Sequence, residues 1–291
     1  MAHTLFKSGI VVTQDRGLGV LPSGVLPCGD VLVDGDRIAA IGEHLSAPAA
    51  EIVDCSGHFV MPGLINAHMH TWQTALRSVA ANWTLLEYFR HVHAGLATVF
   101  TPEDIHIATL AGALNQLDHG VTTLVDWAHN NPTPAHTDAG VTALKESGIR
   151  AAFFHGSPKP DPKPGEPHFS EVPHPRREIV RLLKGALNDR TALVTLGMAI
   201  LGPHYSTLEV SAHDFARDSR RAHTECIRGN RCRAQRFRLR RLHRLMRCNE
   251  ESVRRFTDAV VRFRTETHVV HAVGKRDTGR QIGEVYRASI G

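Results

Sequence analysis

The chain has 291 residues, a hydrophobic content of 42% and a formal net charge of +5 at pH 7, which suits one large or two modest soluble domains. No apolar run approaches the roughly 20 residues that span a bilayer, and the first residues lack the pattern of a signal peptide, so we expect no membrane span. The five cysteines are few and widely spaced, which favours a reducing compartment and a cytoplasmic location.

The first 60 residues contain short β-branched runs separated by glycine and aspartate. The runs are FKSGIVVT, GDVLVDGDRIAAIG and EIVDCSGHFVMPG, and VDGD supplies the chemistry of a hairpin turn. Several short strands with such turns predict a small β-sandwich-like domain over residues 1–60.

From residue 61 the pattern changes to strands alternating with helices. The apolar run GLINAHMH predicts a buried strand. The segments that follow are a helix over 102–118, a strand in GVTTLVDWAHN, a helix over 136–148, a strand in IRAAFFHG and a strand in VTLGMAILGPHYS. This alternation predicts an α/β fold, the first half of a parallel (β/α) barrel over residues 61–215.

A proline-rich segment separates the third and fourth of these strands. Residues 157–175 contain seven prolines, which excludes a helix or a central strand. The segment is predicted to be an extended loop, either a lid over a site or a surface excursion.

Charge divides the chain at residue 216. Residues 1–215 carry 14 Lys and Arg against 21 Asp and Glu, a balance of −7, and residues 216–291 carry 20 against 8, a balance of +12. Few β-branched residues occur in 216–251, and residues 216–291 are predicted to be an irregular or helical Arg-rich segment.

Two histidines stand one residue apart at the end of the run VMPGLINAHMH. Residues i and i+2 of a strand point to the same side, so His68 and His70 are predicted to project together. Two imidazoles at the carboxyl end of one strand can bind one divalent metal, although an isolated H-x-H also arises by chance.

Further motifs in the same order resemble the amidohydrolase superfamily, in the branch with cytosine and guanine deaminases and triazine chlorohydrolases. The resemblance covers residues 1–215. It rests on VMPGLINAHMH, on Gln73 three residues after His70, on Trp83 in NWTLLEYF, on TPED and GVTT, and on GPHYS with His204.

The resemblance implies a (β/α)8 barrel and a metal-dependent hydrolase of carbon–nitrogen (non-peptide) bonds. The implied substrate is a nitrogen heterocycle, the reaction that of an aminohydrolase or chlorohydrolase, and the cofactor one divalent metal, Zn²⁺ or Fe²⁺. It makes His68 and His70 the first metal ligands and places Gln73, Trp83 and His204 beside the substrate. His155, at the end of its strand, is predicted to be either a substrate contact or a structural histidine.

The family's remaining residues are not recognisable after residue 206. H-x-x-E occurs only as His168 to Glu171, in the proline-rich loop and out of order. His268 and His271 offer a weak imitation of a later ligand strand, and no strand returning to the N-terminal domain is recognised. The sequence therefore predicts an incomplete site with impaired activity and assigns no catalytic residue.

Three interpretations of residues 216–291 remain open. A frameshift in G+C-rich DNA converts alanine, glycine and proline codons to arginine codons, and it would explain the loss of motif order. A functional basic segment would bind nucleic acid or another polyanion, which makes a non-catalytic binding protein the alternative function. The third interpretation is a metal knuckle of Cys226, Cys232, His243 and Cys248.

A half barrel leaves sheet edges and apolar surface without partners, and such surfaces associate. We therefore predict that the purified chain forms homo-oligomers or aggregates. Light scattering checks this prediction, and a monodisperse monomer would contradict it.

Overall fold

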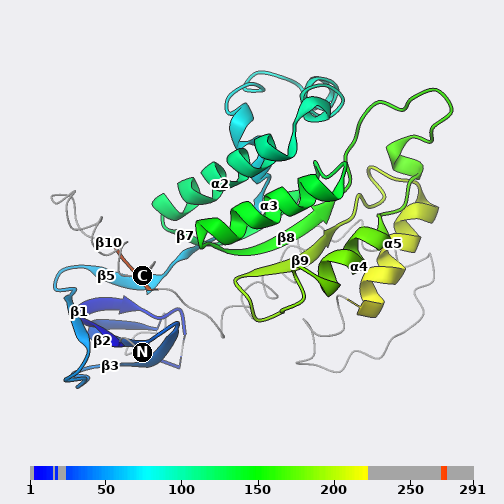
Figure 1. The fold of residues 1–291 in the computed structure, drawn as a ribbon. Coiled ribbons are helices and arrows are strands. Elements are labelled where there is room, and N and C mark those ends of the chain that lie inside the picture. The colour runs from blue at the N-terminus through cyan, green and yellow to red at the C-terminus, as the bar shows by residue number, and fades with distance from the viewer. Residues whose placement is uncertain (1–2, 16, 19–23, 222–269, 274–291) are drawn as a thin grey trace. The chain divides into compact units, whose positions relative to one another are not determined.

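Figure 1 shows the computed structural model of the chain, which describes residues 3–15, 17–18, 24–221 and 270–273. The chain divides into two compact units, residues 1–64 with 235–291 and residues 65–234. Each unit has its own sheet and its own apolar core. Within the described part of the chain, no helix is long and apolar enough to cross a bilayer.

The first unit contains one mixed sheet. Its strands lie in the order β10-β5-β1-β2-β3, with β4 beside β1. β1 pairs antiparallel with β2 and parallel with β4 and β5. The bounds are β1 (His3–Val12), β2 (Val25–Asp34), β3 (Arg37–Gly42), β4 (Glu51–Asp54), β5 (Phe59–Pro62) and β10 (Val270–Val273). The strands over residues 1–60 match the prediction, but the described strands form a single mixed sheet where a sandwich was expected.

β10 corrects two expectations about the C-terminal part of the chain. It pairs antiparallel with β5 and places His271 opposite Met61. A strand does return to the N-terminal sheet, and His271 belongs to that sheet rather than to a later strand of a barrel. The physical reason is the open edge of β5, whose backbone groups need partners that sequence periodicity does not reveal.

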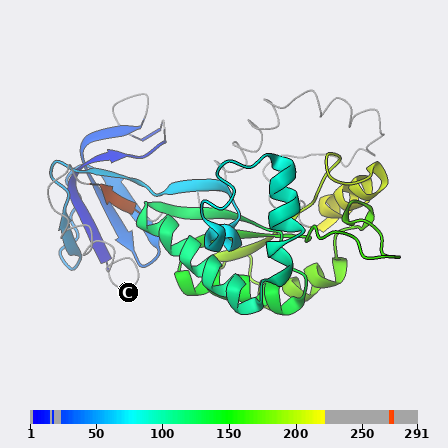
Figure 2. The same cartoon turned by 90° about the horizontal axis from the view of Figure 1, so that it is seen from above.

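The second unit contains a four-stranded sheet in the order β6-β7-β8-β9, in which β7, β8 and β9 pair in parallel. Helices α2 and α3 lie along the same face of this sheet (Figures 1 and 2). The strands are β6 (Leu64–Met69), β7 (Val121–Ala128), β8 (Arg150–Gly156) and β9 (Val194–Ala199). The helices are α1 (Leu85–Tyr88), α2 (Pro102–Asp118), α3 (Pro134–Ser147), α4 (Arg176–Lys184) and α5 (Leu208–Arg221). Short 3₁₀ or π turns are η1 (Thr71–Leu76), η2 (Phe89–His93), η3 (Leu96–Val99) and η4 (Phe169–Glu171). The predicted alternation of strands and helices is confirmed.

Local sequence explains where the long helices begin and end. Thr101 caps α2: its hydroxyl accepts from the Asp104 backbone N–H at 3.2 Å, and the Asp104 carboxylate accepts from the Thr101 N–H at 2.8 Å. Pro102 occupies the first turn, where its missing N–H costs nothing. α3 ends at Gly148, whose φ of 72° favours glycine.

The core of the second unit lies between the sheet and α3. Phe153, on β8, is fully buried, and Gly140 of α3 lies against its ring. Leu124 on β7 and Leu144 on α3 are also fully buried in this cluster. These residues come from the positions at which the strand and helix periodicities predict inward-facing side chains.

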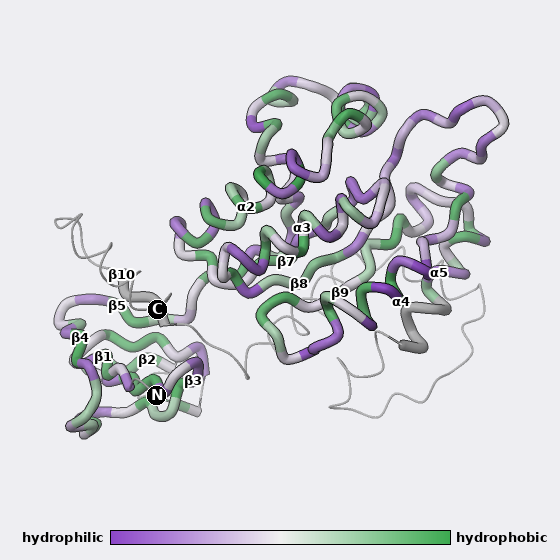
Figure 3. The backbone as a smooth tube through the Cα atoms, in the orientation of Figure 1, coloured by the Kyte–Doolittle hydropathy of each residue, from purple (hydrophilic) through white to green (hydrophobic). Residues whose placement is uncertain are grey.

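The proline-rich loop between β8 and α4 is mostly exposed. Figure 3 shows that it is also mostly hydrophilic. Two of its residues are nevertheless buried: Lys159 is 8% exposed and His174 is 6% exposed. His174 Nε2 lies 2.7 Å from the carbonyl oxygen of His155, and its backbone N–H donates to the Asp214 carboxylate at 3.1 Å. Through these two contacts, His174 attaches the loop to His155 on β8 and to Asp214 on α5.

Several predictions about the C-terminal part concern residues outside the described ranges. These are the proposed metal knuckle of Cys226, Cys232, His243 and Cys248, the basic segment between α5 and β10, and His268. They stay predictions.

Phe153→Ala is predicted to lower the free energy of unfolding of the second unit by about 3–5 kcal/mol, because it leaves a cavity in a fully buried site. The matched control is Phe215→Ala on α5, where the side chain is 46% exposed and we expect a loss below about 1 kcal/mol. All three tryptophans lie in the second unit, so urea unfolding followed by tryptophan fluorescence reports on this unit. Equal losses in the two variants would contradict the assignment of the core.

Candidate metal centre

His68 and His70 lie together at the carboxyl end of β6, as the strand periodicity predicts. The two Nε2 atoms are 3.3 Å apart, and the ring centroids are 4.8 Å apart with the ring planes at 83°. Two nitrogen ligands on one tetrahedral zinc, each at about 2.0–2.1 Å, stand about 3.3 Å from each other. The spacing of this histidine pair therefore fits two ligands of one metal ion.

The backbone of β7 orients the second imidazole. His70 Nδ1 lies 2.8 Å from the carbonyl oxygen of Trp127. A carbonyl only accepts, so Nδ1 carries the hydrogen and Nε2 keeps its lone pair on the side of His68. Metal-binding histidines commonly donate their other N–H to a backbone carbonyl in this way.

Burial keeps His70 in the form that binds metal. Loss of solvation lowers its pKa, the Trp127 carbonyl opposes this shift, and the charges of His68 and Lys159 lower the pKa further. The imidazole is consequently neutral at pH 7, as a metal ligand must be.

A buried carboxylate holds the chain immediately after the histidine pair. Asp126 of β7 accepts from the Thr71 backbone N–H at 3.0 Å and from the Thr71 hydroxyl at 2.8 Å. Asp126 could equally have capped the turn after β7, but in the structure it is fully buried and binds the first residue of η1. It positions the ligand pair through the backbone.

Two further histidines, His93 and His129, lie beside the pair. The ring of His129 stacks on His70 with the centroids 4.3 Å apart, and the ring of His93 meets His129 edge to face at 4.5 Å. Both are buried, with 3% and 4% exposure. Burial lowers the pKa of His93 to about 3 and lowers that of His129 well below its usual range. Sequence reasoning missed both, because neither falls in a short motif with His68.

Hydrogen bonds fix which nitrogen of His129 carries the hydrogen, and they connect His93 to Gln73 through Tyr88. The Trp72 indole N–H donates to His129 Nδ1 at 3.0 Å, so the neutral His129 ring carries its hydrogen on Nε2. The Gln73 amide donates to the Tyr88 hydroxyl at 2.5 Å, and that hydroxyl lies 3.0 Å from His93 Nε2. Gln73 is thus held in place by Tyr88.

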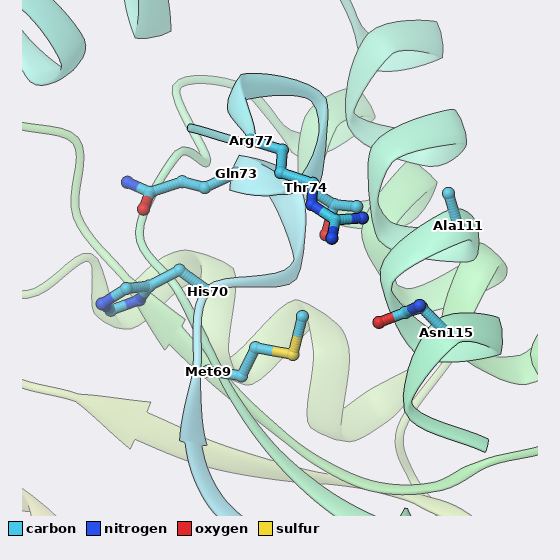
Figure 4. A pocket seen from close by; sticks show the side chains of 7 residues that line it. All are labelled: Met69, His70, Gln73, Thr74, Arg77, Ala111 and Asn115. Atoms are coloured by element: carbon cyan, nitrogen blue, oxygen red, sulfur yellow. The ribbon is translucent and has the colours of Figure 1, made fainter. Parts of the chain in front are cut away.

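A cavity of about 450 Å³ lies beside η1 (Figure 4). In the figure, the side chains of His70 and Gln73 extend to one side of η1, and Thr74 and Arg77 extend toward α2. The lining residues are Met69, His70, Gln73, Thr74, Arg77, Ala111 and Asn115. Gln73 therefore lies on the same side of η1 as His70, and its role as a substrate residue stays a prediction.

The other predicted substrate residues have contacts of their own. Trp83 packs at the margin of the apolar cluster around Trp72, with its ring 5.1 Å from His91. His204 is exposed in the turn after β9. His155 is 1% exposed, and its ring lies 3.4 Å from the Thr137 hydroxyl of α3 and 3.3 Å from His174. These contacts give His155 a structural setting, and the substrate roles of all three residues stay predictions.

Within the described residues, no group of three or more histidine, cysteine or acidic side chains is arranged to hold a metal ion. The metal-ligand roles of His68 and His70 therefore stay predictions. His168 and Glu171, the out-of-order H-x-x-E, lie around η4 in the proline-rich loop.

Comparisons with known proteins give the family. The model of the amidohydrolase family matches residues 59–206, half of the chain, and the chain therefore belongs to this family. Over 157 residues the chain is 30% identical to a 5'-deoxyadenosine deaminase of Methanosarcina acetivorans, covering 54% of this chain and 34% of the relative. It is 33% identical over 152 residues to a 5-methylthioadenosine/S-adenosylhomocysteine deaminase of Pyrococcus furiosus, covering 52% and 33%. The matched segment spans about a third of these relatives' length.

The fold of the chain also resembles a solved structure. It is a variant of atrazine chlorohydrolase from Arthrobacter aurescens complexed with zinc and atraton, with a TM-score of 0.59 and 23% identity over 74% of this chain and 50% of the other. Similarity at this level of identity shows a shared fold. It supports the predicted barrel-type architecture, of which the described residues form four strands.

The pH dependence of stability tests the role of Asp126. Burial raises its pKa from 3.8 to about 6, so between these values the folded protein keeps a proton that the unfolded chain has lost. Stability should therefore fall as pH rises through this window, by up to about 3 kcal/mol relative to Asp126→Asn, which does not titrate. Urea unfolding with EDTA present, repeated across the window, measures this difference.

Asp104→Asn is the matched control for this measurement. Hydrogen bonds from Thr101 lower the pKa of Asp104, so the wild type should gain stability relative to this variant as pH rises, the opposite sign. A pH-independent difference between the wild type and Asp126→Asn would contradict the assigned environment of Asp126.

Proposed function

We propose that the chain functions as a metal-dependent hydrolase of a nitrogen heterocycle. The reaction would displace an amino group, as in an aminohydrolase, or chloride, as in a chlorohydrolase. The metal would be Zn²⁺ or Fe²⁺. The observation that carries the proposal is the His68–His70 pair, with its Nε2 atoms 3.3 Å apart and the His70 Nδ1 held by the Trp127 carbonyl.

The relatives support this reaction class. Two are deaminases of adenosine derivatives, and the third is a chlorohydrolase whose structure contains zinc and a triazine, atraton. All three names concern reactions or ligands of nitrogen heterocycles, but the leaving groups differ. The heterocycle is therefore the more general part of the proposal.

The described residues have separate tasks in this proposal. His68 and His70 would hold the metal, and the Asp126–Thr71 contact would keep both rings in position. When bound, such a metal lowers the pKa of a water molecule toward neutrality. Gln73 lies on the same side as His70 and would contact the substrate, with Trp83 and His204 as further substrate residues. Catalytic zinc sites use three protein ligands, so the activity requires at least one ligand from outside the described part.

Metal binding is the direct test. We predict that the full chain, stripped with a chelator, binds about one Co²⁺ per chain. We expect His68→Ala and His70→Ala each to abolish this binding, because each removes one of the two described ligands. Visible absorption of bound Co²⁺ measures stoichiometry and geometry together. His119→Ala is the matched control, since this histidine is exposed and bonded to the Asn115 carbonyl at the end of α2.

Two results would overturn the proposal. The first is Co²⁺ binding that survives both histidine substitutions. The second is a metal-loaded chain that releases neither ammonia from amino-substituted purines and pyrimidines nor chloride from chlorotriazines.

A further inference from the structure

The cavity beside η1 extends to a side of β6 that the proposed metal centre does not use. Its volume is about 450 Å³, and residues of β6, η1 and α2 line it together with Arg77, which follows η1 (Figure 4). Met69 stands between His68 and His70, and successive strand residues point to opposite faces, so its side chain points away from both imidazoles. This side chain packs against the apolar cluster between the sheet and α3. A ligand in this part of the cavity would therefore lie on the helix-covered side of β6.

Arg77 and Asn115 provide polar groups on opposite walls of this part of the cavity. Figure 4 shows that Arg77 extends toward α2 and that Asn115 extends from α2 into the space between them. Both residues are exposed, so a ligand from solution can reach them. Among the described residues, none forms an ion pair or hydrogen bond with the Arg77 guanidinium or with the Asn115 side-chain amide. No aspartate or glutamate of the described chain lines the cavity, so the charge of Arg77 is not neutralised there.

A close contact at Gly112 of α2 holds the two walls together. A Cβ added at Gly112 would lie 2.5 Å from the Thr74 hydroxyl oxygen and 3.3 Å from the Thr71 carbonyl oxygen, so glycine permits this approach of α2 to η1. The contact fixes the separation of the two walls, and the cavity is therefore present before a ligand binds. Met69 and Ala111 add apolar surface to the lining. The volume of about 450 Å³ lies within the range of roughly 300–1,000 Å³ that small-molecule pockets occupy.

We propose that this cavity binds a small organic carboxylate, whose oxygens bond the Arg77 guanidinium and whose apolar part contacts Met69 and Ala111. A guanidinium stays charged in proteins and presents parallel N–H groups that match the two oxygens of a carboxylate. The Asn115 amide offers a further N–H donor from the opposite wall. The site goes beyond the proposed function, because its ligand lies on the other side of β6 from the imidazoles and needs no contact with the metal.

The test uses two probes of nearly the same shape, benzoate and benzamide, of which benzoate alone is charged. The full chain is stripped of metal with a chelator and dialysed, so that the chelator's own carboxylates do not compete for the site. Ligand-observed NMR titration at pH 7 then measures both dissociation constants. We expect benzoate to bind about 10-fold more tightly than benzamide, as one charge-assisted hydrogen bond provides. Added NaCl should reduce this preference, because salt screens exposed charges.

Four variants locate the site. Arg77→Met should remove the preference for benzoate, and Arg77→Lys should retain part of it, because lysine keeps the charge but not the paired N–H groups. Ala111→Phe fills the cavity from an exposed position of α2 and should weaken the binding of both probes. Arg90→Met is the matched control, since this arginine of η2 is exposed and does not line the cavity. Tryptophan fluorescence checks that each variant is folded, and Ala111→Phe tests the site even where Arg77→Met fails to fold.

The proposal is overturned by equal binding of the two probes, by binding of neither, by a preference that persists in folded Arg77→Met, or by unchanged binding in folded Ala111→Phe. Because these titrations contain no metal, they are independent of the Co²⁺ experiment. Absence of the benzoate preference in the wild type with intact Co²⁺ binding rejects the carboxylate site alone, and the reverse result rejects the metal centre alone.

Discussion

The candidate site depends on one constraint, the attachment of the end of β6 to the end of β7. Asp126 and the carbonyl of Trp127 are consecutive on β7, and they bind Thr71 and His70, which are consecutive after β6. Side chains at successive strand positions point to opposite faces. The Asp126 side chain therefore reaches the chain on the helix-covered face, while the backbone next to it orients the imidazole. A change in the register of β6 against β7 would lose both contacts together.

Burial determines the protonation states of the histidines near this attachment. Desolvation makes His70, His93 and His129 poor proton acceptors, so their rings stay neutral and available as ligands or hydrogen-bonding groups. The same low polarity makes Lys159 costly to bury.

The described residues include the segment that matches the amidohydrolase family. They form the strands β6, β7, β8 and β9 of one sheet, the adjacent imidazoles of His68 and His70, and the polar network of Gln73, Tyr88 and His93. The relatives contain about three times the matched length. The proposed activity therefore has two separable parts, a metal-binding pair that the described chain supplies and a completed ligand set that it must obtain elsewhere. β10 shows that residues far along the chain can join elements near its start.

Local patterns determined much of this protein from its sequence. The spacing of His68 and His70 on an apolar strand predicted their common side, TPED predicted the start of α2, and Gly148 the end of α3. Tertiary structure alone decided the rest. His93, His129 and Lys159 come from a π turn, a strand end and a proline-rich loop, and no sequence spacing relates them to His68. Asp126 could have capped a local turn, and β10 could have been part of an irregular tail. For Asp126 and β10 the outcome depended on distant backbone groups that needed hydrogen-bonding partners, and only the folded chain brings such groups together.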